Sequence, residues 1–219
     1  NSTTAVELYA DTGLSAVGMT EYLRDRALDS ARVLMQFKKD GVKYQRTSFI
    51  SYPANVLVMR FAASEKGKQN LTFSYAPNPV STGTLSAEGK DGLVYRAKLD
   101  NNQMEYVVRM RALTQGGTLQ NTDGKLRIED ADEVVFLITA DTDYKINFNP
   151  DFSNPKTYVG VNPEQTTAAW MEEAARQGYK TLLQEHVQDY AALFNRVKLD
   201  LGNKDYRDMP ITERLHLYR

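Results

Sequence analysis

The residues best suited to chemistry in this sequence are two closely spaced aspartates, Asp141 and Asp143, which follow an apolar stretch. Two carboxylates at the end of a strand could bind a cation or act as an acid/base pair. A single D-x-D sequence brings no further ligand with it, and such aspartates commonly cap an element or hydrogen-bond within a loop. We therefore favour a structural role for both residues.

Two ring-bearing side chains in the C-terminal third are also candidate substrate-binding residues. Trp170, the only tryptophan, could stack on a sugar ring, and His186 could serve as a catalytic base. Both lie among apolar residues at helical spacing, which favours a core position for Trp170 and a hydrogen-bonded interface position for His186. The glutamates Glu172, Glu173 and Glu185 are expected to face solvent. The sequence thus identifies no catalytic residue and no metal site.

The composition argues against several classes of function. The chain has 27 Lys and Arg against 28 Asp and Glu, so its net charge of −1 gives no general attraction for nucleic acid or an anionic membrane. It has no cysteine, which excludes thiolate catalysis, and its two histidines are too few for a His-rich metal site. The sequence contains no apolar run of membrane-spanning length and no signal-peptide pattern, and it implies no cofactor.

The first two-thirds of the chain predict antiparallel strands. Residues 31–64 read as a meander, in which Asp40-Gly41 is the strongest hairpin signal because Gly, and to a lesser degree Asp, tolerates the positive φ of a type I′ turn. Residues 55–61 and 133–140 are apolar on both faces, as in strands at the middle of a packed sheet. Residues 20–29 are predicted to form an extended edge or a turn of helix, and Gly116-Gly117 a hairpin turn. This regular spacing of short strands is typical of a β-sandwich.

The apolar period becomes helical after three Asn-Pro pairs between residues 149 and 163. We predict two helices over residues 165–196, beginning at Thr166 or Thr167 and separated at Gly178, where a glycine suits a C-terminal cap. A strand is predicted over residues 197–201, and the start of a further helix with Thr212 as its N-cap. The second helix carries an apolar stripe, which comprises Tyr179, Leu183, His186, Tyr190, Leu193, Phe194 and Val197. Five of these residues are expected to pack on a sandwich face, namely Tyr179, Leu183, Tyr190, Leu193 and Phe194.

Several short sequences, in their order along the chain, resemble the N-terminal region of glycoside hydrolase family 95, the α-L-fucosidase-like enzymes. The similarity covers most of the chain and is weakest over residues 64–130. It is carried by Tyr22-Leu23-Arg24, Leu28-Asp29-Ser30-Ala31, Asp40-Gly41-Val42-Lys43-Tyr44, Ser51-Tyr52-Pro53 with the following NVLVMRF, residues 140–144 (ADTDY), Gln177-Gly178-Tyr179, and above all residues 186–201 (HVQDYAALFNRVKLDL).

The resemblance implies a mainly β fold, in which an antiparallel β super-sandwich is followed by two linker α-helices. Residues 1–160 correspond to the sandwich without the family's N-terminal Gly-rich segment, residues 161–202 to the linker with a final strand, and residues 203–219 to the start of an absent (α/α)6 barrel. In such enzymes the barrel carries the catalysis. The matching positions are not the catalytic ones, so the resemblance carries over no catalytic residue.

Two functions remain open at this point. In the first, the chain is the non-catalytic domain of an exo-acting, secreted or periplasmic glycoside hydrolase that acts on fucosylated or L-galactosylated glycans. This domain would brace the barrel and contribute to the edge of its pocket, and the chain alone is expected to be inactive. In the second, the chain is a free-standing sandwich that binds carbohydrate or protein without enzymatic activity.

Overall fold

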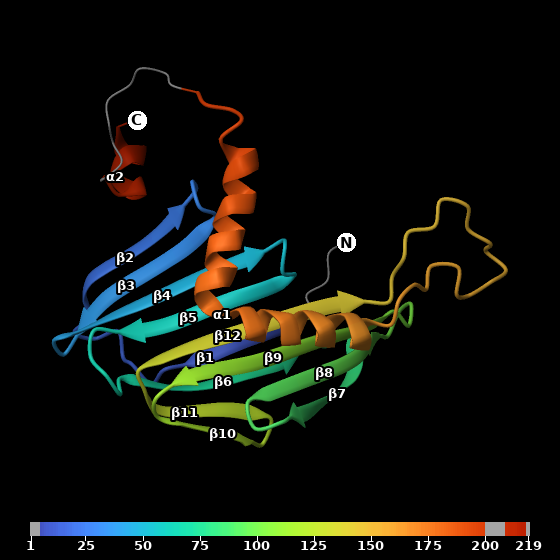
Figure 1. The fold of residues 1–219 in the computed structure, drawn as a ribbon, viewed down its shortest axis with the longest axis horizontal. Helices are drawn as coiled ribbons and strands as arrows, with labels where there is room; N and C mark the ends of the chain where they lie inside the picture. The colour runs from blue at the N-terminus through green and yellow to red at the C-terminus, as the bar shows by residue number, and fades with distance from the viewer. Residues whose placement is uncertain (1–4, 200–208, 218–219) are drawn as a thin grey trace.

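The chain folds into two packed antiparallel β-sheets with a long helix across one of them (Figure 1). The structure, a computed structural model, describes residues 5–199 and 209–217. Within these residues the larger sheet has eight strands, in the spatial order β2 (Thr20–Ala27), β3 (Arg32–Lys39), β4 (Val42–Ser51), β5 (Val56–Ala63), β12 (Glu133–Thr142), β9 (Glu105–Gln115), β8 (Gly92–Leu99) and β7 (Ser81–Glu88). The smaller sheet has four, in the order β1 (Val6–Asp11), β6 (Gln69–Pro77), β11 (Lys125–Ala131) and β10 (Thr118–Thr122). The mainly β fold predicted from the sequence is confirmed.

The meander at residues 31–64 forms β3, β4 and β5, as predicted. Asp40 and Gly41 alone join β3 to β4, and their φ angles of 48° and 84° suit a type I′ turn. β5 and β12 run antiparallel at the centre of the eight-stranded sheet, which explains why both are apolar on two faces. Residues 20–27 form an edge strand, which is the first of the two alternatives left open by their sequence.

The main core lies between the two sheets. Phe136 of β12 stacks on Phe73 of β6 with ring centroids 4.1 Å apart, and both rings are fully buried. Tyr95 and Tyr106 are also buried in this layer, and the Tyr106 hydroxyl donates to Ser81 Oγ at 2.8 Å. These two tyrosines are therefore core residues.

A second core lies between the eight-stranded sheet and helix α1 (Pro163–Phe194). Figure 1 shows α1 crossing this sheet with a sharp change of direction part-way along. The change occurs at Gly178, whose φ of 72° and ψ of 169° are non-helical and accessible mainly to glycine. The predicted break at Gly178, with a helical segment on either side, is confirmed.

Helix α1 begins earlier than predicted. Asn162 is its N-cap, with a side chain that accepts a hydrogen bond from Glu164 N at 2.9 Å, and Pro163 occupies the first turn. Thr166 and Thr167 therefore lie inside the helix. The Asn-Pro pair that resembled loop punctuation is a cap followed by the proline that suits the first helical position, because proline has no N–H to leave unpaired there.

The predicted hairpin at Gly116-Gly117 is wrong. These glycines connect β9 of the larger sheet to β10 of the smaller one, so the chain crosses between the two layers. β9 is already paired on both sides, by β8 and by β12, and has no free edge for β10. One edge is taken by the preceding strand β8 and the other by β12, which follows β10 and β11 along the chain, so the local turn signal could not reveal the crossing.

The predicted strand over residues 197–201 is also wrong where it can be compared with the structure. Residues 197–199 are not in a strand, and residues 200–201 lie outside the described residues. A short helix, α2 (Ile211–His216), follows near the end of the chain. It begins after Pro210, so Thr212 lies within the helix and is not its N-cap.

The apolar stripe on the second segment of α1 packs on the sandwich only in its first half. His186 is buried, and Tyr179 and Leu183 are partly buried against the core under α1, whereas Leu193 is 58% exposed and Phe194 is 44% exposed. His186 already lies against Ala31, in the turn between β2 and β3 at the edge of the sheet. The prediction that Leu193 and Phe194 dock on a sandwich face is therefore wrong, because the helix continues past the sheet that could bury them.

Candidate functional site

The two aspartates of the D-x-D sequence make separate hydrogen bonds to neighbouring elements. Asp141 accepts from the Thr166 hydroxyl on α1 and from Thr142 N at 2.8 Å, so it ties the end of β12 to the helix. Asp143 accepts from Glu105 N at 3.1 Å. Asp141 lines a pocket of about 500 Å³ and Asp143 lines a different one of about 600 Å³. Neither pocket is lined by both aspartates, so Asp141 and Asp143 do not form an acid/base pair with each other.

His186 lies in the interface between α1 and the eight-stranded sheet. It is buried, its ring stacks on Phe49 at 4.8 Å, and its Nε2 lies 3.2 Å from the carbonyl oxygen of Ala31. The buried His186 ring therefore contributes to the contact between the helix and the sheet and is not accessible to a substrate. Trp170 is half-buried on the first segment of the same helix.

The three helical glutamates differ in exposure. Glu172 is exposed and lies 3.2 Å from Arg111 on β9, and Glu173 pairs with Arg176 one turn along the helix. Glu185 is half-buried. No group of three or more His, Cys, Asp and Glu side chains in the described part of the chain is placed to hold a metal ion.

A buried arginine, missed in the sequence, fastens the start of α1 to the sheet. The Arg109 side chain is only 4% exposed and pairs with Glu88 of β7 and with Glu164 of α1. Its Nε also donates to the Thr167 hydroxyl at 3.1 Å. The available signal was its position inside the apolar run of β9, where an unpaired charge would be costly to bury.

Glu164 joins this network to the neighbouring strand. Arg96 of β8 donates to both Glu164 carboxylate oxygens at 2.6 Å, a bidentate arrangement. These hydrogen bonds are the main reason that the pKa of Glu164 lies below its ordinary value, with the charge of Arg109 acting in the same direction. Every member of the network contacts another element of the fold, so it is a structural lock for the helix rather than a reacting centre.

The connection between β12 and α1 projects from the sandwich (Figure 1). At its base the backbone of Lys145 donates to Tyr158 O at 2.7 Å, and the rings of Tyr144 and Tyr158 stack with centroids 6.0 Å apart. Its outer part carries the exposed side chains of Phe148, at 90%, and Phe152, at 84%. The 600 Å³ pocket that Asp143 lines lies between the base of this loop and the connection from β8 to β9.

Comparison with known proteins decides the family. Residues 5–147 match the family described as Glycosyl hydrolase family 65, N-terminal domain. The chain belongs to this family. The resemblance to α-L-fucosidase-like enzymes seen in the sequence is confirmed by its curated relatives.

Two of these relatives are α-fucosidases by name. The chain is 29% identical over 209 residues to Probable alpha-fucosidase A of Aspergillus niger and 26% identical over 204 residues to Alpha-L-fucosidase 2 of Arabidopsis thaliana. The alignments cover 90% and 83% of this chain but 25% and 24% of the relatives. The chain therefore spans about a quarter of the length of the curated relatives that it matches.

A solved structure shares the fold of this glycosyl hydrolase domain. The Putative kojibiose phosphorylase from human microbiome matches with a TM-score of 0.60 and 9% sequence identity, over 88% of this chain and 28% of that chain. At this identity the similarity shows the fold alone. Within the described residues, none of the helices is both long and apolar enough to cross a membrane.

Proposed function

We propose that this chain is the non-catalytic N-terminal domain of an exo-acting glycoside hydrolase that cleaves terminal α-L-fucosyl or related linkages. The observation that carries the proposal is the match of most of the chain to about a quarter of the length of each of two α-fucosidases. In this role the sandwich braces a catalytic barrel elsewhere in the parent protein and contributes to the edge of its pocket. The secreted or periplasmic location of that parent is part of the same proposal.

The chemistry of the described residues supports a non-catalytic role. Glycoside hydrolysis commonly needs two carboxyl groups on opposite sides of one bond. Asp141 and Asp143 line separate pockets, while Glu88 and Glu164 are held by arginines in the lock under α1. These four carboxylates of the described residues therefore do not form a pair across a sugar, which supports the role of a scaffold.

The loop of residues 143–162 supports the proposed contact with the parent's barrel. Phe148 and Phe152 are almost completely exposed, and Ile146 is 58% exposed. A surface loop gains nothing from large apolar side chains in water, and exposed apolar patches commonly mark interaction sites. The loop begins where β12 ends and leads directly into α1.

Enzyme assays on two proteins test the proposal. The 219-residue chain should not hydrolyse an aryl α-L-fucoside, and the gene product that contains it should do so. Turnover by the purified chain that is lost in Asp141→Ala or Asp143→Ala would overturn the non-catalytic assignment. Retention of the chain on immobilised glycans, with no activity in the longer product, would favour the free-standing binding module.

A matched pair of variants tests the loop within the longer product. Phe152→Ser removes an apolar side chain from the loop, and Tyr52→Ser removes one that is 81% exposed at the turn between β4 and β5. We expect Phe152→Ser to lower the thermal stability or the activity of the longer product and Tyr52→Ser to change neither. Equal effects of the two substitutions would contradict the proposed contact.

A further inference from the structure

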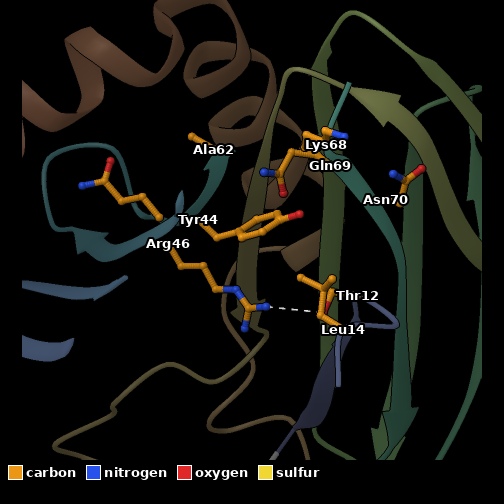
Figure 2. A pocket seen from close by; sticks show the side chains of 9 residues that line it. Thr12, Leu14, Tyr44, Arg46, Ala62, Lys68, Gln69 and Asn70 are labelled. Atoms are coloured by element: carbon orange, nitrogen blue, oxygen red, sulfur yellow. Dashed lines mark hydrogen bonds between the residues drawn. The ribbon is translucent and has the colours of Figure 1, made fainter. Parts of the chain in front are cut away.

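A small pocket of about 90 Å³ lies between the two sheets at one edge of the sandwich (Figure 2). Its walls come from β4 and β5 of the eight-stranded sheet, from residues 68–70 at the start of β6 in the other sheet, and from residues 12 and 14 after β1. None of the residues considered above as candidate sites lines it. The pocket is therefore a separate feature of the fold.

Arg46 supplies the central positive charge of this pocket. Its guanidinium carbon lies 5.5 Å from the ring centre of Phe37 and 5.4 Å from that of Phe61, so the two aromatic faces hold it. Its polar contacts are long, at 3.4 Å to the Thr12 hydroxyl and 3.9 Å to Met35 Sδ. A guanidinium has five N–H donors, so most of its hydrogen-bonding capacity is unused by the described part of the protein.

No carboxylate among the described residues forms an ion pair with Arg46. Burial lowers the pKa of Arg46, and the neighbour that opposes this shift is the hydroxyl of Tyr22. Glu65 pairs with Lys68 of the pocket wall at 3.8 Å. In this respect Arg46 differs from the buried Arg109, which has two acidic partners.

Two further donors face the same space. Gln69 is only 4% exposed, and its Nε2 is buried without a hydrogen-bond partner. Such a group costs free energy unless something else supplies the missing acceptor. The Tyr44 hydroxyl also makes no hydrogen bond among the described residues, while its ring stacks on Phe37 at 5.2 Å. Figure 2 shows Tyr44, Arg46 and Gln69 around the pocket, with Thr12 beside the guanidinium.

We propose that this pocket binds a small carboxylate, with Arg46 donating to its two oxygens and with Gln69 and Tyr44 donating further hydrogen bonds. The aromatic rings cover the faces of the Arg46 guanidinium and leave the N–H groups along its edge open to a ligand. The spacing of these N–H groups matches the two oxygens of a carboxylate. A volume of about 90 Å³ is that of roughly three water molecules, enough for a carboxylate and the carbon that bears it. An acidic sugar or a simple organic acid carries this group.

Titration followed by NMR tests the proposal on the 219-residue chain. The ¹⁵N-labelled protein receives sodium acetate, sodium glucuronate, sodium sulfate or glucose at constant ionic strength. We expect acetate and glucuronate to shift the amide signals of residues 44–46 and 68–70 with saturation, and glucose to leave them unchanged. Arg46→Met should weaken carboxylate binding by at least about tenfold, because it removes the charged fork and keeps an apolar stem between the rings.

Three further variants give the test its controls. Gln69→Leu should weaken binding to a smaller extent than Arg46→Met. Lys90→Met removes one positive charge from the turn between β7 and β8, at the other end of the eight-stranded sheet, and should leave binding unchanged. Arg46→Lys keeps the charge without the planar guanidinium and should also bind the carboxylates weakly. This variant tests the same contact if Arg46→Met unfolds.

Several outcomes would overturn the proposal. One is the lack of a saturable shift with either carboxylate, and another is a shift that persists in both Arg46 variants. Tighter binding of sulfate than of acetate would contradict recognition by the planar edge. Because the pocket is separate from the projecting loop and from the parent's catalysis, these results do not depend on whether the proposed α-fucosidase function is correct.

Discussion

Truncating Leu182 to alanine tests whether helix α1 is a docked part of this glycosyl hydrolase domain or only a spacer. Leu182 is fully buried between the second segment of α1 and the eight-stranded sheet, in a cluster with Phe49 and Val58. Leu193 lies on the same segment and is 58% exposed. Leu193→Ala is therefore a matched control, since it makes the same chemical change on the same helix.

The structure sets the size of the expected difference. Leu→Ala removes three carbon atoms, and at about 0.8 kcal/mol for each fully buried carbon the transfer loss at Leu182 is about 2.4 kcal/mol. The cavity left in a packed interface adds to this, so we expect a loss of about 3 kcal/mol in the free energy of unfolding. Leu193 buries less than half of its surface, and the higher helix propensity of alanine offsets part of its loss, so we expect about 1 kcal/mol or less.

Equilibrium unfolding in urea measures both values. With a slope of about 2–3 kcal/mol per M, Leu182→Ala should lower the midpoint by roughly 1–1.5 M and Leu193→Ala by less than about 0.5 M. The slopes of both variants should equal that of the parent chain, so that midpoints report stability. Equal midpoint shifts in the two variants would refute the docking of α1 through Leu182.

Three further predictions concern α1 and the candidate carboxylates. Glu164 has a lowered pKa when folded, so its ion pairs stabilise the protein above the ordinary glutamate pKa and are lost as the pH falls through the lowered value. Melting temperatures between pH 7 and pH 3 should therefore fall more in the parent chain than in Glu164→Gln, and parallel curves would contradict this. Gly178→Ala should cost about 1–3 kcal/mol in urea unfolding, because alanine disfavours the φ of 72° even though its Cβ would meet no neighbouring atom; an unchanged midpoint would show that the helix tolerates another geometry there. The purified chain should not turn over 4-nitrophenyl α-L-fucoside, and activity that disappears in Asp141→Ala or Asp143→Ala would show that we have overlooked a catalytic pair.

Turns and strand interiors were predictable from the sequence because their causes are local. Asp40-Gly41 formed the expected turn since the positive φ at both positions depends on those two residues. Residues 133–140 were correctly placed in the middle of a sheet because apolar side chains on both faces need cover on both faces. The break at Gly178 likewise followed from the conformational freedom of one residue.

Only the tertiary structure decided features that depend on what lies opposite a residue. Gly116-Gly117 became a crossing between sheets because β8 takes one edge of β9 and β12, which lies beyond β10 and β11 along the chain, takes the other. Leu193 and Phe194 have the same apolar character and helical spacing as the buried part of α1, but the sheet ends before it reaches them. Arg46 and Gln69 come together from different sheets, and neither stands out in its own strand. Helical and strand periods show which face of an element is apolar, whereas burial, ion pairing and a shared pocket require a partner surface, whose position is set by long-range packing.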